Sequence, residues 1–253
     1  MQQHYFNIND AGLNIRCKLY SEGKDEVRTL VICGHGFGGH KDNRAAERFS
    51  KHVLDKNHGA IVLTFNWPCH GDDVRKTLRL FDCDAYLSAV LSWIRSRYPD
   101  AALFGYATSF GGYLFLKYVS EHGNPFRKLA LRCPAVTMYD VMTSGIMTES
   151  DLERIKKGKP VSVGFDRKVE IDKVFLDSIR DADITQRDFL PYADELCILQ
   201  GTKDEIVPFD AVKAFAEENV IDFEPVENAD HRFQSPEKMD FVIAKICAFF
   251  ELK

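Results

Sequence analysis

The stretch that decides the fold is residues 101–117, AALFGYATSFGGYLFLK. It opens with a short apolar run, which predicts a buried strand of a parallel sheet. From Gly111 onward the apolar spacing predicts a helix packed on that sheet. Ser109 lies between strand and helix, with Ala107 two residues before it and Gly111 two residues after it. These small neighbours predict a sharp turn that pushes the serine oxygen out at the end of the sheet.

The turn has the form Ala-x-Ser-x-Gly, a variant of the Gly-x-Ser-x-Gly turn that carries a nucleophilic serine in some enzymes. A serine near glycines is also common as an ordinary turn residue. A nucleophilic serine needs an imidazole base within hydrogen-bond reach and an acid that orients the imidazole. The motif therefore indicates catalysis only if such partners occur elsewhere in the chain.

Apolar strands and amphipathic helices alternate on both sides of this stretch. Residues 4–20 predict an antiparallel hairpin that turns at positions 9–12, NDAG. Together these patterns predict an α/β fold with a mostly parallel central sheet, helices on both faces and the hairpin at the N-terminus. Further strands are predicted at 29–33, 60–67, 128–134, 195–201 and 221–227, and helices at 42–57, 82–98, 211–220 and 236–252.

Residues 135–190 break this rhythm. They combine short helical patterns with many charges and are too long for one crossover between neighbouring strands. We therefore interpret 135–190 as an inserted cap, and 1–134 together with 191–253 as the core domain.

The bulk composition excludes several classes of protein. The 253 residues carry a formal charge of −5, which offers no electrostatic footprint for nucleic acid or an anionic membrane. No apolar run approaches the roughly 20 residues of a membrane helix, and no signal peptide is visible at the N-terminus. The seven cysteines form no CxxC pair and no metal-binding spacing, which favours a reducing cytoplasm.

Two strand-end loops offer partners for Ser109, since the carboxyl ends of parallel strands meet at one edge of a sheet. The strand at 195–201 is followed by Asp204 and Glu205, either of which could orient an imidazole. A turn or helix-capping role is the common alternative for such an acid. The last strand is followed by His231, which could act as the base or lie solvated at the surface.

The order Ser109, Asp204, His231 is the order of the catalytic triad in the α/β-hydrolase superfamily, which this sequence resembles over nearly its whole length. The matching stretches are ATSFGG, GTKDEIVP and NADHRF. The resemblance selects Asp204 over Glu205, because the family pattern is Gly-x-x-Asp-x-x-Val-Pro. It implies Ser109 as nucleophile, His231 as base and Asp204 as the orienting acid.

A fourth matching stretch is HGFGG at residues 35–39. In the superfamily one backbone N–H of this loop and one from the residue after the nucleophile stabilise the oxyanion. Carried over, these are the amides of Phe37 and Phe110. We expect the His35 ring to support the loop, with a contact to substrate as the alternative, while His70, in PCHGDD, has either a structural role or a contact with substrate.

The resemblance implies a serine hydrolase that cleaves a carboxylic ester through an acyl-enzyme, with no metal and no cofactor. The insertion resembles that of small intracellular carboxylesterases of the cinnamoyl or feruloyl esterase type, and also that of serine-aminopeptidase-like hydrolases. An amidase, an aminopeptidase or an acyltransferase of the same fold is therefore an alternative, and a non-catalytic binding module is another.

We expect a small acyl substrate as the partner and consider a homodimer possible. Met142 and Met147 of the cap are candidates for the acyl pocket, because methionine adapts to varied ligands. Packing of the cap onto the sheet is the alternative role for both side chains.

Overall fold

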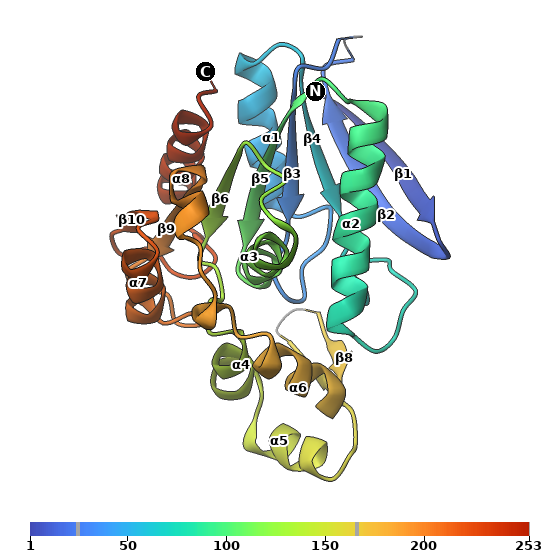
Figure 1. The fold of residues 1–253 in the computed structure, drawn as a ribbon, viewed down its shortest axis with the longest axis vertical. Coiled ribbons are helices and arrows are strands. Elements are labelled where there is room, and N and C mark those ends of the chain that lie inside the picture. Colours follow the sequence, from blue (N-terminus) through green and yellow to red (C-terminus); the bar gives the residue numbers. More distant parts are fainter. Residues whose placement is uncertain (24–25, 165–166, 253) are drawn as a thin grey trace.

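An eight-stranded sheet in the order β1-β2-β4-β3-β5-β6-β9-β10 forms the centre of the computed structural model (Figure 1). The structure describes residues 1–23, 26–164 and 167–252. The pairs β1–β2 and β2–β4 are antiparallel, and the remaining neighbours are parallel. The strands span Gln2–Asp10 (β1), Leu13–Ser21 (β2), Thr29–Gly34 (β3), Ala60–Phe65 (β4), Ala102–Thr108 (β5), Lys128–Arg132 (β6), Leu196–Gly201 (β9) and Asp222–Val226 (β10).

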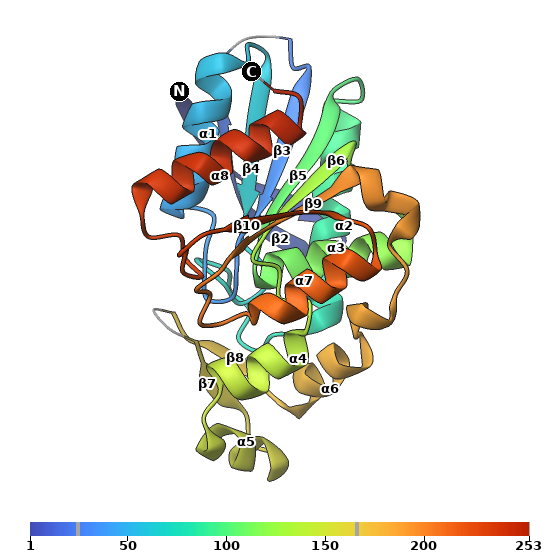
Figure 2. The ribbon, with the colours of Figure 1, turned by 90° about the vertical axis from the view of Figure 1, so that its left-hand side faces the viewer.

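Helices cover both faces of this sheet, as the sequence predicts. Side chains alternate along β3, so that Leu30 and Ile32 belong to one apolar core and Val31 and Cys33 to the other. One core includes α2 (Leu80–Arg97), α3 (Phe110–His122) and α7 (Phe209–Glu218), and the other includes α1 (Arg44–Lys56) and α8 (Pro236–Phe249). Figure 2 shows α8 and α1 together on their side of the sheet.

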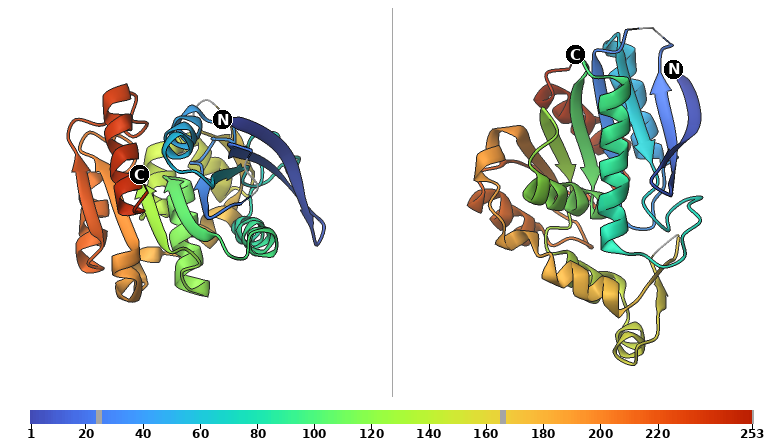
Figure 3. Two further views of the ribbon diagram at one scale, coloured as in Figure 1. Left: turned by 90° about the horizontal axis from the view of Figure 1, so that it is seen from above. Right: turned by 45° about the vertical axis from the view of Figure 1, so that its right-hand side comes forward.

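The N-terminal hairpin also agrees with its prediction. Ala11 and Gly12 connect β1 to β2 with φ of 44° and 83°, and Asp10 pairs with Leu13. Positive φ at both central residues is the backbone form that matches the right-handed twist of two strands. The hairpin lies at one end of the twisted sheet and β10 at the other (Figure 3).

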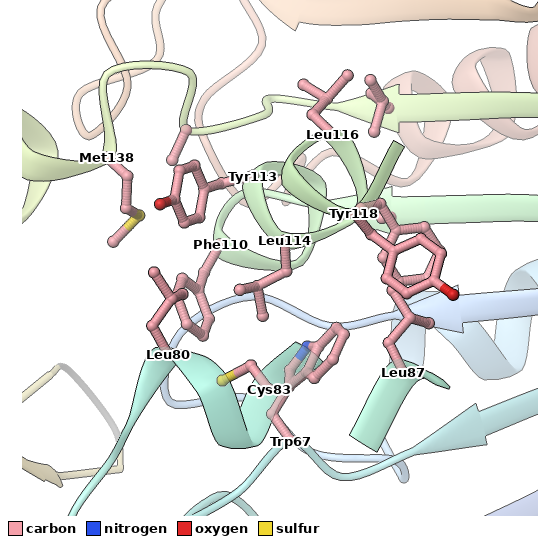
Figure 4. Packing of buried hydrophobic residues seen from close by; sticks show 14 of the residues in the cluster. Trp67, Leu80, Cys83, Leu87, Phe110, Tyr113, Leu114, Leu116, Tyr118 and Met138 are labelled. Atoms are coloured by element: carbon pink, nitrogen blue, oxygen red, sulfur yellow. The ribbon is translucent and has the colours of Figure 1, made fainter. Parts of the chain in front are cut away.

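The helix α3 holds the centre of the larger core. Phe110 and Leu114 face Trp67, Leu80 and Cys83 across the core (Figure 4). Phe110 and Trp67 are fully buried, so each adds about 2–3 kcal/mol of hydrophobic stabilisation. This packing fixes the axis of α3 and therefore the position of its first turn.

The chain between β6 and β9 lies beyond the carboxyl ends of the parallel strands (Figures 1 and 2). Tyr113 Oη donates to the carbonyl of Ala182 at 3.0 Å, and Arg79 binds Asp172 through two nitrogens at 2.9 and 2.7 Å, which ties this segment to α3 and α2. Its elements are α4 (Met138–Asp140), a π-helical turn (Val141–Ile146), α5 (Glu149–Lys156), β7 (Val161–Val163), β8 (Val169–Ile171), α6 (Lys173–Asp181) and two 3₁₀ turns (Ile184–Gln186, Leu190–Glu195).

The structure adds one hairpin to the predicted elements and shifts most predicted bounds by one to three residues. The hairpin β7–β8 was not predicted, because strands of three residues are too short to show an alternating pattern. The helix predicted at 211–220 is α7, which begins at Phe209, directly after its N-cap Pro208, and ends at Glu218. Among the described residues no helix is both long and apolar enough to span a bilayer.

Candidate active site

Ser109 occupies the turn between β5 and α3 in a backbone conformation that few residues adopt. Its φ of 54° and ψ of −118° make it the N-cap of α3, a strained position for a residue with a side chain. The turn closes because Gly111 carries no side chain: a Cβ there would lie 2.6 Å from the carbonyl oxygen of His35. Ala107 is fully buried beside this turn. The Ala-x-Ser-x-Gly pattern thus meets the steric demand of the turn.

His231 bridges Ser109 and Asp204. Its Nδ1 lies 2.8 and 3.0 Å from the two carboxylate oxygens of Asp204, and its Nε2 lies 3.0 Å from Ser109 Oγ. Because an ionised carboxylate only accepts hydrogen bonds, Nδ1 carries the imidazole proton and donates it to Asp204. Nε2 is then free to accept from the serine hydroxyl. The three residues that the sequence singled out from distant loops therefore form one connected chain of hydrogen bonds.

Asp204 is held rigidly and its side chain is fully buried. Its Oδ1 accepts from the backbone N–H groups of Ile206 and Val207 at 2.9 and 2.8 Å, and its Oδ2 accepts from Gln200 Nε2 at 3.0 Å. Burial alone raises the pKa of the Asp204 carboxyl, but the hydrogen bonds and charge of His231 and the two backbone donors outweigh burial and lower that pKa below its ordinary value. Asp204 therefore stays ionised opposite the imidazole.

The competing acid, Glu205, lies beside His231 in another role. Its Oε2 accepts the backbone N–H of His231 at 3.2 Å and makes no contact with the ring nitrogens. Arg132 Nη1 donates to the carbonyl of Arg232 at 3.1 Å, so the loop is held on the other side of His231 as well. Both contacts fix the loop that presents the imidazole.

Known proteins share both this sequence pattern and this fold. A model of the alpha/beta hydrolase fold matches residues 29–168, more than half of the chain. The chain belongs to the alpha/beta hydrolase fold family. No curated protein sequence matches it.

Solved structures extend the likeness over the whole chain at the level of the fold. Est1E from Butyrivibrio proteoclasticus, solved with ferulic acid bound, is 17% identical with a TM-score of 0.80, covering 97% of this chain and 98% of its own. The esterase domain of a Rhodothermus marinus protein is 17% identical with a TM-score of 0.69, covering 98% of both chains. A serine hydrolase without a lid from Xanthomonas campestris is 17% identical with a TM-score of 0.66, covering 99% of this chain and 94% of its own.

The two residues expected to supply oxyanion donors lie side by side. Phe110 is the first residue of α3, where a backbone N–H has no acceptor within the helix. Phe37 lies in the loop after β3, and its ring meets the Phe110 ring edge-on with the centroids 5.6 Å apart. Gly36 lies directly against Ser109, since a Cβ on it would be 3.2 Å from Ser109 Cβ. The loop after β3 and the start of α3 thus flank Ser109 together.

His35 supports this loop through both ring nitrogens. Nδ1 donates to the carbonyl of Gly36 at 2.8 Å, and Nε2 accepts the backbone N–H of Trp67 at 3.3 Å. The Trp67 indole N–H donates in turn to the His35 carbonyl at 3.0 Å. Burial, with a smaller contribution from the neighbouring His70, lowers the pKa of His35 well below its ordinary value. The ring is therefore neutral at neutral pH.

His70 lies beneath the same loop and does not line the cavity described below. Its Nδ1 donates to the carbonyl of Pro68 at 2.8 Å, and its ring lies 5.5 Å from the Phe37 ring and 6.1 Å from the Phe110 ring. Complete burial lowers the pKa of His70 to about 4. These contacts favour the structural alternative for His70, while Gly71 and Asp72, which follow it, reach the cavity.

A cavity of about 930 Å³ opens at Ser109 and His231. Met142 and Met147, expected at the acyl pocket, do not reach it: both are buried in the apolar core, and Ile146 lines the cavity instead. The π-helical turn 141–146 sets which side chain faces the cavity, and no sequence pattern predicts such a turn.

Charged residues that the sequence did not point to also line this cavity. Lys41 binds Asp72 at 2.7 Å and Asp42 at 3.2 Å, and its backbone N–H donates to Asn66 Oδ1 at 2.7 Å. Arg132 and Arg167 line it too. Each lies in a loop or at a strand end, where a lone basic residue resembles an ordinary surface charge.

Cys133, Asp204 and His231 place one potential metal ligand each within 4.8 Å of one another. Asp204 and His231 are already bonded to each other, and burial raises the pKa of the Cys133 thiol well above its ordinary value. A neutral thiol is a poor metal ligand. A second group, Asp84, Glu121 and His122, lies at the surface.

Proposed function

We propose that this protein is a serine hydrolase that cleaves carboxylic esters through an acyl-enzyme. The observation that carries the proposal is the position of His231, whose ring accepts from Ser109 Oγ at 3.0 Å and donates to Asp204 at 2.8 Å. The family to which the chain belongs and the esterases among its structural neighbours support the same reaction class.

In the first step Ser109 Oγ attacks the ester carbonyl carbon while His231 Nε2 takes the hydroxyl proton. The buried carboxylate of Asp204 stabilises the imidazolium that results. Collapse of the tetrahedral intermediate expels the alkoxide, which receives the proton from His231 and leaves as an alcohol. A water molecule, deprotonated by His231, then attacks the acyl-enzyme, and the acid is released as Ser109 regains its proton.

The backbone N–H groups of Phe37 and Phe110 stabilise the negative charge that develops on the carbonyl oxygen. Two fixed donors aimed at an oxyanion supply a large share of catalysis, because they need no reorganisation during the reaction. No step of this proposal calls on a metal or a cofactor.

The test is replacement of the nucleophile in the pure protein. We expect Ser109→Ala to abolish hydrolysis of 4-nitrophenyl butyrate and labelling by a fluorophosphonate probe. Ser120→Ala is the matched control, because Ser120 lies on the same helix and its hydroxyl donates to the Lys117 carbonyl at 2.8 Å. Turnover and labelling that persist in Ser109→Ala would refute the proposal. A panel of esters, hydroxycinnamates and aminoacyl amides then separates esterase from peptidase activity.

A further inference from the structure

A second group of polar side chains lies at the floor of the cavity that contains Ser109 and His231. Tyr106 and Thr108 are two residues apart on β5 and therefore share one face of the sheet. Thr108 pairs in register with Arg132 at the end of β6. All three residues are among those that line the cavity.

The guanidinium of Arg132 is buried with few acceptors. Arg132 is only 5% exposed, and among the described residues no carboxylate lies within ion-pair distance of it. Its Nη1 donates to the carbonyl of Arg232 at 3.1 Å, and its Nη2 makes only a long bond of 3.4 Å to Thr108 Oγ1. Within the described part of the chain, neither Arg132 Nε nor the Tyr106 hydroxyl has a hydrogen-bond partner.

Such an arrangement is unfavourable for the protein alone. A guanidinium carries five N–H donors and stays charged at every physiological pH, so burial without a counter-charge is costly. The ring of Phe233, 5.2 Å from the guanidinium carbon, offsets only part of this cost. A buried charge that the fold leaves uncompensated is typical of a site completed by a ligand.

Other groups that line the cavity do not neutralise Arg132. The carboxylates of Asp42 and Asp72 bind Lys41, and Glu205 accepts the backbone N–H of His231. The first turn of α1, through Ala45 and Ala46, also lines the cavity and brings the positive end of a helix dipole to it. This end of the cavity is therefore suited to negative charge.

We propose that Arg132, with the hydroxyls of Tyr106 and Thr108, binds an oxyanion on the substrate, a carboxylate or a phosphate, while the ester carbonyl lies at Ser109. A guanidinium and hydroxyl groups are donor types that bind carboxylate and phosphate oxygens. This assignment rests on the proposed hydrolase function and names its substrate class: esters that carry an anionic group in the acyl or the alcohol part.

The experiment compares kcat/KM for charged and neutral ester pairs. The acyl arm uses 4-nitrophenyl monoesters of adipate, pimelate and suberate against 4-nitrophenyl hexanoate, and the alcohol arm uses 4-carboxyphenyl butyrate against phenyl butyrate. The ratio within a pair is the readout, because any shift of the His231 loop caused by a change at Arg132 affects both members alike. We expect Arg132→Gln to lower the charged-to-neutral ratio about 10- to 100-fold in one arm, as for loss of a charge-assisted hydrogen bond.

Three further variants sharpen the result. Arg132→Lys retains the charge and should restore part of the ratio. Tyr106→Phe removes a buried hydroxyl that forms no hydrogen bond of normal geometry within the described residues, so it should change the melting temperature little and still lower the ratio about threefold or more. Arg167→Gln is the matched control, since Arg167 lines the same cavity with an exposed side chain. An equal loss in Arg167→Gln, or an unchanged ratio in both Arg132→Gln and Tyr106→Phe, overturns the proposal.

Binding to Ser109→Ala protein separates this proposal from the hydrolase proposal. Adipate or inorganic phosphate should raise its melting temperature, and the added Arg132→Gln change should remove that effect; the two anions distinguish carboxylate from phosphate as the preferred group. Arg132-dependent stabilisation without turnover of any ester would retain the anion site and reject the hydrolase. Turnover of both members of each pair with no Arg132 dependence, and no stabilisation by either anion, would retain the hydrolase and reject the anion site.

Discussion

The buried ring of His70 predicts that the protein loses stability in mild acid. His70 is completely buried beneath the loop of Phe37, and its pKa is lowered by burial from the ordinary 6.5 to about 4. Between these two pH values His70 is protonated in the unfolded chain but not in the folded protein. The free energy of unfolding therefore falls as the pH drops from 6.5 towards 4, and this contribution becomes constant above and below that window.

The magnitude follows from the separation of the two pKa values. They lie about 2.5 pH units apart, and each unit is worth about 1.4 kcal/mol, so protonation of the unfolded state alone removes about 3 kcal/mol by pH 4. His35, whose ring centroid lies 5.3 Å from that of His70, has its pKa lowered in the same direction and steepens the same limb. A loss of this size is a large fraction of the stability of an ordinary domain.

The assay is urea unfolding followed by tryptophan fluorescence at several pH values from 7.5 to 4.5. His70→Asn is the informative variant, because the asparagine amide can replace the Nδ1–H donor to the Pro68 carbonyl but does not titrate. We expect its stability to fall less steeply below pH 6.5 than that of the wild type, by about 1.4 kcal/mol per pH unit. His4→Asn, the same substitution at an exposed position on β1, should leave the slope unchanged.

Parallel stability profiles for the wild type and His70→Asn between pH 6.5 and 4.5 would refute this reasoning. They would mean that the folded protein admits a proton to His70 as readily as the unfolded chain does, which contradicts burial as the cause of the lowered pKa.

Three further outcomes are expected. Asp204→Asn should lower kcat for ester hydrolysis by about ten thousand-fold with little change in KM, because an amide favours the wrong imidazole tautomer; a loss below tenfold would contradict that role. Gly111→Ala should lower the melting temperature by about 8 °C, since its Cβ meets the His35 carbonyl at 2.6 Å, and an unchanged melting temperature would show that the turn relaxes. A double-mutant cycle on Arg79 and Asp172, with Arg79→Met and Asp172→Asn, should give a coupling energy of about 1 kcal/mol from this partly exposed two-bond contact; a value near zero would exclude the contact in solution.

Much of this protein can be predicted from local sequence patterns. Strands and helices are encoded in apolar spacings of two and of three to four residues, so the α/β order, the hairpin at Ala11-Gly12 and the two-faced sheet are correctly predicted. Ser109, Asp204 and His231 are found because each follows a strand, and the carboxyl ends of parallel strands meet at one edge. The small residues around Ser109 are also a local requirement, imposed by one turn.

The surroundings of a charged side chain depend on which strands become neighbours, and local sequence patterns do not specify that. In the sequence Arg132 is one basic residue at the end of a strand, and only the pairing of β6 with β5 places it beside Thr108 and Tyr106 on the floor of the cavity. Likewise, only the family resemblance selects Asp204 over Glu205 in the sequence, and the loop geometry supplies the physical reason: it aims Asp204 at the ring and Glu205 at the backbone of His231. Sequence periodicity determines which residues are buried and in which element, whereas the environment of a charge is set by contacts between segments far apart in the chain, and only the tertiary structure decides those.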